Sequence, residues 1–300
     1  MRRKVILHGP SSMCVSLPSS WVKKNEINKG AELEMTESGN HLVISNTEPV
    51  KNEKKTEISF ENMPYQLQKE VLVALYEKGY DEIRIKSTEE GTLKNVYRFL
   101  NAYHLGLEIT QQEQHSFVLR NVAVPGDEQF CDLFQRVYRI TLEFSEKIKV
   151  FLKDQNNITE SSMLHACSVR RIANYCRRII IKNNRKYGVY HATAISSLVA
   201  ISDSISALHQ DVCDGKHASR ELVTAYTKLC GILLASFELF QRFDYETYTE
   251  IDSELKKLNE KISHLKQKQR KTFCCWEHAH NIAKNLSQIL PAILSIKTQG

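Results

Sequence analysis

The N-terminal fold is decided by RRKVILHG (residues 2–9), SLPSSWV (16–22) and HLVI (41–44). Glycine turns at Gly9, Gly30 and Gly39 separate short strand-like runs, and Pro18 opens a short helix because a first helical position needs no N–H donor. We expect strands at residues 4–7, 13–17, 31–35 and 41–45. So small a unit leaves apolar faces uncovered, which a second copy or the rest of the chain must bury.

The same stretch is strongly basic. Between Met1 and Asn25 there are five basic and no acidic residues, hence a net charge of +5. Such a cluster can replace the counterions of a nucleic-acid backbone, and binding of that kind weakens steeply with salt. A solvated chain terminus is the alternative interpretation of residues 2–4. The five candidates are Arg2, Arg3, Lys4, Lys23 and Lys24.

A fixed order of motifs links this stretch to a known family. A basic strand is followed by Gly-x-Ser-Ser (9–12), Val-Ser-Leu-Pro (15–18), Trp-Val (21–22), Asn-Lys-Gly (28–30) and the Gly39 hairpin. This order resembles the AbrB/SpoVT swapped-hairpin DNA-binding domain, in the version that opens archaeal PhoU-type phosphate uptake regulators. The resemblance implies a homodimer through the N-terminal domain and contact with double-stranded DNA. One commonly basic family position, after Leu-Pro, is Ser19 here.

The composition is that of an ordinary globular protein. The chain has 300 residues, of which 42% are hydrophobic and 25% charged, and a net charge of +6. Apolar runs such as residues 231–235 are too short to cross a membrane, and the N-terminus lacks a signal-peptide core. We therefore expect a cytoplasmic protein without membrane insertion. The 8 cysteines form no CxxC pair, and we expect most of them to be reduced and buried.

Two further domains follow a charged linker at residues 48–56. Residues 57–122 alternate between strand and helix periods and predict a small α/β domain. Its strands are expected at 58–60, 81–85, 107–109 and 117–119, and its helices at 67–75 and 93–103. The segments at 76–83 and 105–109 resemble the middle part of the same archaeal regulators.

The last domain, at residues 127–296, is predicted to be all helical. Ile251, Leu255, Leu258, Ile262 and Leu265 are spaced by four and three residues, which is typical of a helix seam that faces partner helices. Six helices are expected, at 128–153, 159–183, 187–212, 217–243, 245–268 and 271–294.

Two sets of three helices match the architecture of PhoU proteins. The resemblance thus implies a multidomain α+β chain: an AbrB-like swapped-hairpin β-barrel, a small α/β middle domain and a PhoU-like bundle of two three-helix repeats. In PhoU the third helix of each repeat carries a metal-binding Glu-x-x-x-Asp motif. Here Val199 and Phe273 replace the glutamates and leave only Asp203 and Glu277, too few carboxylates for a metal cluster. We expect no metal cofactor.

A zinc site among His264, His278, His280, Cys274 and Cys275 is a second metal hypothesis. On a helix, Cys274 and His278 are the only pair at a suitable i, i+4 step. Two ligands do not make a structural zinc site.

A second basic segment lies between residues 161 and 202, which contain no acid. Its cations could bind an acidic partner or an anion, or could add to DNA contact. Alternatively, they form a solvated face neutralised by acids of neighbouring helices such as Glu143 and Glu146. The candidates on one broad helical face are Arg170, Arg171, Arg177, Arg178 and Lys182.

Catalytic motifs are not found. The sequence has no Gly-rich phosphate loop, Gly-x-Ser-x-Gly elbow or HExxH motif, so we expect no enzyme. The resemblance implies a DNA-binding transcriptional regulator of phosphate uptake, whose helical module receives a signal from a transporter or regulatory protein. The alternative is a dimeric adaptor that does not bind DNA and regulates a phosphate transporter or signalling protein through the bundle.

Overall fold

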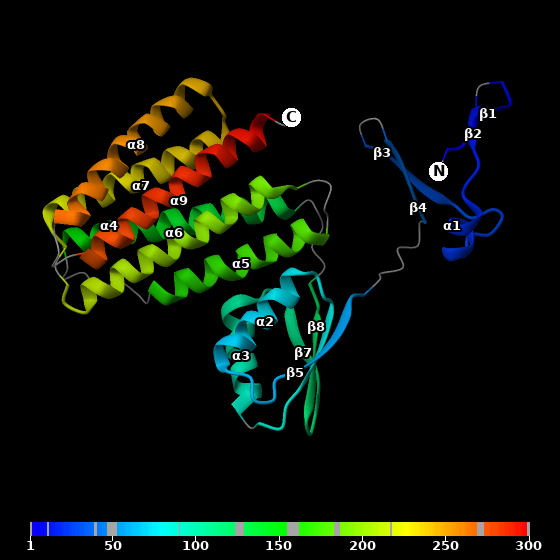
Figure 1. Cartoon of the computed structure of the whole chain (residues 1–300), viewed down its shortest axis with the longest axis horizontal. Helices are drawn as coiled ribbons and strands as arrows, with labels where there is room; N and C mark the ends of the chain where they lie inside the picture. The colour runs from blue at the N-terminus through cyan, green and yellow to red at the C-terminus, as the bar shows by residue number, and fades with distance from the viewer. Residues whose placement is uncertain are drawn as a thin grey trace. The chain divides into compact units, whose positions relative to one another are not determined.

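The computed structural model of the chain is a mixed α+β structure (Figure 1). Contacts between Cα atoms divide it into two compact units, Met1–Glu53 and Lys54–Gly300. The structure describes residues 2–10, 12–38, 41–46, 53–89, 91–123, 129–154, 162–182, 187–216, 218–268 and 273–298.

The N-terminal unit consists of two antiparallel hairpins and one short helix. Val5 faces Val15 in the first hairpin, whose turn contains Gly9 at φ +72°. Among the described residues, neither hairpin pairs with the other. The predicted strands and helix are therefore confirmed within a few residues. The elements are β1 (Val5–His8), β2 (Ser12–Val15), α1 (Ser19–Lys24), β3 (Leu33–Ser38) and β4 (His41–Asn46).

The described side chains of this unit form no buried core. None of its side chains whose burial is described is buried, and α1 has no buried residue. Its large apolar side chains are exposed instead. They are Val5, Ile6, Leu7, Met13, Val15, Met35 and Leu42, called the apolar strand residues below.

The second unit begins with a four-stranded sheet in the order β5-β6-β8-β7. The first two strands are parallel and the others antiparallel. Strand β5 begins at Lys55, so the predicted linker at 48–56 is too long by two residues; positions 48–52 of it lie outside the described residues. The strands are β5 (Lys55–Ser59), β6 (Glu82–Lys86), β7 (Leu107–Glu113) and β8 (Ser116–Asn121).

Two helices, α2 (Tyr65–Glu77) and α3 (Gly91–Tyr103), lie on one face of this sheet (Figure 1). Alternate residues of β6, Ile83 and Ile85, are fully buried, as expected for a strand with one face covered. The small α/β domain therefore has its own apolar core.

Six helices form a bundle that packs on this domain through α5. All six were predicted within about four residues at their ends. In α9 Pro291 lies inside the helix on an exposed position. The helices are α4 (Phe130–Lys153), α5 (Ser162–Lys182), α6 (Val189–Cys213), α7 (Arg220–Gln241), α8 (Tyr245–Lys268) and α9 (Phe273–Thr298).

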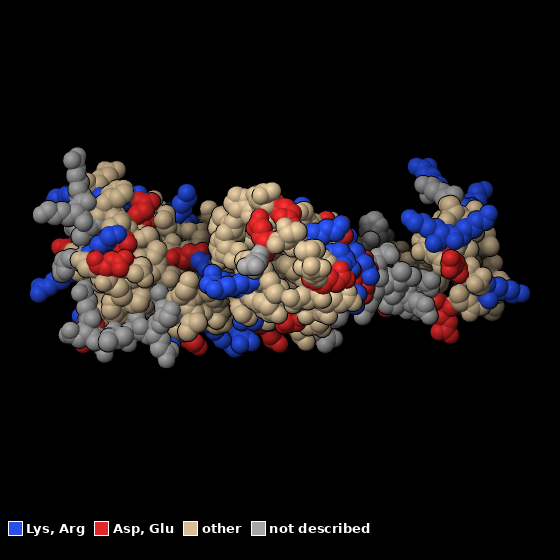
Figure 2. Space-filling view, turned by 90° about the horizontal axis from the view of Figure 1, so that it is seen from below, with Lys and Arg blue, Asp and Glu red and all other residues tan. Residues whose placement is uncertain are grey.

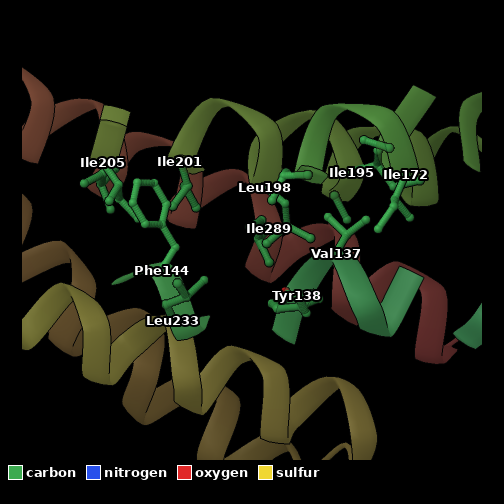
Figure 3. Close-up of a cluster of buried hydrophobic side chains, with 14 of the residues drawn as sticks. Val137, Tyr138, Phe144, Ile172, Ile195, Leu198, Ile201, Ile205, Leu233 and Ile289 are labelled. Carbon is green, nitrogen blue, oxygen red and sulfur yellow. The ribbon is translucent and has the colours of Figure 1, made fainter. Parts of the chain in front are cut away.

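The bundle contacts follow the same pattern in its two halves. In each half, α4–α6 and α7–α9, all three helices contact one another. Across the halves, α4 packs on α7 and α6 packs extensively on α9. Figure 3 shows side chains from α4, α5, α6, α7 and α9 pointing into one shared core, among them Phe144, Leu198 and Ile289.

Helix α7 is the one described helix that is long and apolar enough to cross a membrane by length and composition. Of its most apolar 18-residue window, 56% is buried inside the structure, where α7 packs on α4, α8 and α9. A core helix of a soluble protein passes the same test, so this helix alone is weak evidence for a membrane span.

Candidate functional site

The five predicted DNA-binding residues are all exposed on the N-terminal unit. Lys23 and Lys24 form the last turn of α1, whose C-terminus is closed by a 2.8 Å hydrogen bond from Asn25 Nδ2 to the Trp21 oxygen. Within the part of this unit that the structure describes, no carboxylate forms an ion pair with any of the five. Figure 2 shows blue Lys and Arg side chains gathered on one part of this unit. DNA contact by these residues stays a prediction.

The acidic residues of the same unit follow the five cations in the sequence. Glu34 and Glu37 lie exposed on β3, and Glu26 and Glu32 precede this strand. The cations therefore come from the first hairpin and α1, while the acids cluster at residues 26–37.

The second basic cluster has a different role. Arg178, on α5, is 0% exposed and reaches the C-terminal end of α2. Its Nη1 donates hydrogen bonds of 2.8 Å to the main-chain carbonyl oxygens of Tyr76 and Tyr80. Its Nη2 lies 2.6 Å from Asp81 Oδ1. The end of a helix presents unpaired carbonyl groups and a partial negative charge, so it is a favourable place for a guanidinium group.

A glycine at the end of α2 makes this approach possible. Gly79 has φ +85°, and the Tyr80 N–H donates to the Leu75 oxygen at 3.2 Å, which is the left-handed helix end that favours glycine. A Cβ at Gly79 would lie 3.2 Å from Cγ of Lys182. The backbone conformation therefore favours glycine here, and a larger residue would in addition have to displace the Lys182 side chain slightly.

Asp81 is the acid that balances the positive charge of α5 at this contact. Lys182 also pairs with its Oδ1, and the Lys54 N–H donates to its Oδ2 at 3.2 Å. Burial acts to raise the pKa of Asp81, but the hydrogen bonds from Lys182 and Lys54 and the charges of Lys182 and Arg178 outweigh it and lower the pKa. Asp81 therefore stays ionised between two cations of α5.

Helix α5 closes the C-terminal end of α3 in the same way. Asn174 Nδ2 donates to the Tyr103 oxygen at 2.8 Å, and Arg171 Nε donates to the His104 oxygen at 3.3 Å. Arg177 pairs with Glu77 at 3.2 Å. Burial raises the pKa of Glu77, and Arg177 opposes this shift.

The basic face of α5 is therefore an internal interface. The prediction that it binds a partner or an anion is wrong for the fully buried Arg178, and the other four cations are also engaged within the chain. The acids expected to neutralise this face were also misidentified. The carboxylates that pair with its cations are Glu77, Asp81 and Asp203, whereas Glu146 pairs with Lys149. The face consists of Arg170, Arg171, Arg177, Arg178 and Lys182.

The two carboxylates considered for a metal cluster are also paired with cations. Arg170 Nη2 lies 2.6 Å from Asp203 Oδ1, and Lys266 pairs with Glu277. Burial raises the pKa of Asp203, and Arg170 opposes this shift. The charge of each carboxylate is thus balanced by a cation of the chain.

A different cluster was missed by sequence reasoning. The carboxylate of Asp211, on α6, lies near the thiols of Cys274 and Cys275, on α9, and the ligand atoms are all within 4.8 Å of one another. The sequence singled out Cys274 and His278, but it gave no sign that Asp211 lies opposite them. His278 is 3.2 Å from Asp211.

The cysteines are less buried than expected. Cys176, Cys230 and Cys275 are buried, Cys131 and Cys213 are exposed, and Cys14, Cys167 and Cys274 are intermediate. All are free thiols. The expectation that most are buried is therefore wrong.

Comparison with known proteins gives no relative. The chain matches no family model, and neither a curated protein nor a solved structure is similar to it.

Proposed function

We propose that the protein is a cytoplasmic, DNA-binding transcriptional regulator. The observation that carries this proposal is the N-terminal unit, in which five cations and the apolar strand residues are exposed and, among the described residues, the cations have no acid partner. Its order of motifs resembles the AbrB/SpoVT domain. Backbone phosphates are the partner that such a patch of lysine and arginine attracts.

A homodimer completes the N-terminal unit in this proposal. Hairpins this small are not stable with both faces in water, and an exposed apolar surface of this kind is typical of a protein–protein interface. A second copy would cover the apolar strand residues and place two basic patches in one assembly. The swapped-hairpin β-barrel of the AbrB/SpoVT domain is such an assembly.

The helical bundle is the signal-receiving module in this proposal. Its two halves share one pattern of helix contacts, which supports the two three-helix repeats of a PhoU-like bundle. By that resemblance the signal concerns phosphate uptake and comes from a phosphate transporter or regulatory protein. A partner that binds one arrangement of the bundle better than another would shift the regulator between states. We assign the protein no catalytic activity and no metal cluster at Asp203 and Glu277.

The test is DNA binding measured by fluorescence anisotropy. The intact protein is titrated onto DNA from its own upstream region and onto a scrambled duplex, over a series of salt concentrations. We expect selective binding that weakens with salt and is lost in the triple variant Arg2→Ala/Arg3→Ala/Lys4→Ala. Each phosphate contact removed should lower the salt slope by about one.

A charge-matched variant separates local contact from net charge. Lys94→Ala/Arg98→Ala/Lys257→Ala removes the same three charges from exposed positions of the second unit, and we expect it to bind as the wild type does. Equal losses in both triple variants would argue for a nonspecific charge effect. No binding to either duplex at low salt would rule out the regulator and leave the dimeric adaptor, which acts through the bundle.

A further inference from the structure

Helix α6 ends in a turn that brings Lys216 back to Asp211. Gly215 has φ +88°. The N–H groups of Lys216 and Gly215 donate 3.0 Å hydrogen bonds to the main-chain carbonyl oxygens of Asp211 and Val212, respectively. These two bonds define a Schellman motif. As a result, Lys216 Nζ reaches Asp211 Oδ1 at 2.6 Å.

The first turn of α9 lies against this carboxylate. The thiols of Cys274 and Cys275 lie within 4.8 Å of this carboxylate and of each other, and Cys275 is buried. The side chain of Asp211 is 16% exposed. Two thiols, a carboxylate and an ammonium group thus meet where α6 ends and α9 begins.

His278 fixes the carboxylate from the other side. It lies one turn after Cys274 on α9, and its Nε2 is 3.2 Å from Asp211 Oδ2. Hydrogen bonds from an outer residue to a ligating carboxylate orient the ligand in many metal sites. Asp211 is therefore held by Lys216 at one oxygen and by His278 at the other.

The arrangement of the two cysteines disfavours a disulfide between them. A disulfide needs Cα atoms about 4.4–6.8 Å apart, whereas consecutive Cα atoms across a trans peptide are about 3.8 Å apart. Within a continuous helix, which α9 is at this point, this spacing cannot widen. Both thiols therefore remain available as ligands.

We propose that Asp211, Cys274 and Cys275 bind a thiophilic divalent cation such as Zn²⁺, with His278 positioning the carboxylate. Tetrahedral zinc with Zn–S bonds of about 2.3 Å places two sulfur ligands about 3.8 Å apart, so ligand atoms within 4.8 Å need to move by about 1 Å. Thiolate ligands favour zinc over magnesium or calcium. Each thiol releases its proton to solvent when its sulfur binds the ion.

Lys216 is the competing cation at this site. Its ammonium group lies 2.6 Å from Asp211 Oδ1, and the ion would bind the same carboxylate. Zn²⁺ binding therefore displaces Lys216, whose side chain is 42% exposed and can move into water. Removing this side chain should strengthen metal binding, the opposite of what happens when a ligand is removed.

The experiment is Zn²⁺ binding to the reduced full-length protein at pH 7.5, measured by competition with a chromophoric chelator. We expect one Zn²⁺ per chain, with Kd raised more than about 100-fold in Cys274→Ser and about 10-fold in His278→Ala, on the scale by which outer-shell changes weaken metal sites. Lys216→Ala should lower the Kd. Co²⁺ bound to the wild type should show a sulfur-to-metal charge-transfer band, a readout that depends on no variant.

Cys213→Ser is the matched control. Cys213 is an exposed thiol two residues after Asp211, and its Sγ lies 3.5 Å from His209 Nε2, outside the group. This variant should bind Zn²⁺ as the wild type does. The proposal is overturned if Cys274→Ser binds like the wild type, if Cys213→Ser loses as much affinity, or if the Co²⁺ complex lacks the sulfur band.

Discussion

The two units of this chain differ in the solvent exposure of their apolar residues. In the second unit Ile83, Phe144 and Trp276 are almost completely buried, whereas in the N-terminal unit Ile6 and Leu7 are 60% and 65% exposed. Both units nevertheless have regular secondary structure. Local sequence signals are therefore enough to place strands and helices, but only the second unit obtains a core from a single chain.

The basic side chains of the two units also differ in whether the fold uses them. In the second unit α5 uses arginine side chains to close the C-terminal ends of α2 and α3, so its cations are part of the fold. In the N-terminal unit the cations face water. A basic cluster in a sequence therefore indicates a binding surface only when the fold leaves it unpaired.

Removing Arg178 should have the largest effect. In Arg178→Ala the main-chain oxygen of Tyr80 loses its side-chain donor, that of Tyr76 keeps only the Gly79 N–H, and Asp81 loses its buried partner. Breaking a buried pair of this kind typically costs about 3–5 kcal/mol. We expect the free energy of unfolding of the second unit to fall by that amount in urea titrations followed by far-UV circular dichroism, while dimer formation through the N-terminal unit is unchanged.

Lys182→Ala is the matched control, because it removes the other cation from Asp81. The Lys182 side chain is 39% exposed, and an exposed ion pair contributes at most about 1 kcal/mol. Equal losses in the two variants would mean that charge alone, and not the closure of α2 by the guanidinium, stabilises the interface.

Acid should weaken the second unit through His104. Burial lowers the pKa of His104 to about 4; its Nδ1 is 3.0 Å from the Phe99 oxygen, and its ring packs edge-on against Tyr76. The unfolded chain has a histidine pKa of about 6.5. The stabilising contribution is therefore present above pH 6.5 and is lost as the pH falls towards 4, by about 3 kcal/mol in all.

This pH effect is measured as the free energy of unfolding between pH 7.5 and pH 4. In His104→Gln the part of the slope that His104 contributes should disappear, although the variant is less stable at neutral pH. His115→Gln changes an exposed histidine of the same unit and should keep the slope. A slope that survives in His104→Gln would assign it to other groups.

Charges placed on β1 should weaken dimer formation through the N-terminal unit and leave the stability of the second unit unchanged. Neighbouring residues on a strand point to opposite faces, so Ile6→Glu/Leu7→Glu puts a charge on both faces of β1. We expect sedimentation velocity to show dimers converted to monomers, with dimer affinity lowered at least about 30-fold, equivalent to about 2 kcal/mol. The urea transition of the second unit should not move.

Asn28→Glu/Lys29→Glu is the control for added negative charge, because both positions are exposed in the loop before β3. It should remain dimeric. A wild-type protein that is monomeric at micromolar concentration would contradict the homodimer itself, whatever the variants do.

The sequence predicted the elements of both units better than their contacts. The six bundle helices follow from sustained apolar periodicity, which is a local signal. Strand β5 was partly assigned to the linker because its residues 55 and 56 are polar, and its pairing with β6 comes from residues 82–86. The role of Arg178 depends on helix ends about 100 positions earlier, and the approach of Asp211 to Cys274 depends on bundle packing. No local pattern encodes either contact.

Helix caps give the smallest effect and separate local from tertiary stabilisation. The N-cap of α7 is Ser219, whose Oγ accepts a 3.2 Å hydrogen bond from the Leu222 N–H, whereas α1 has no side-chain cap at Pro18. Ser219→Ala should destabilise the second unit by about 1 kcal/mol and lower its melting temperature by about 2–4 °C. Ser253→Ala makes the same substitution at an exposed position inside α8 and should be neutral or slightly stabilising, because alanine is the better helix former. Equal melting temperatures for the two variants would show that packing on α4 and α9, and not the cap, determines where α7 begins.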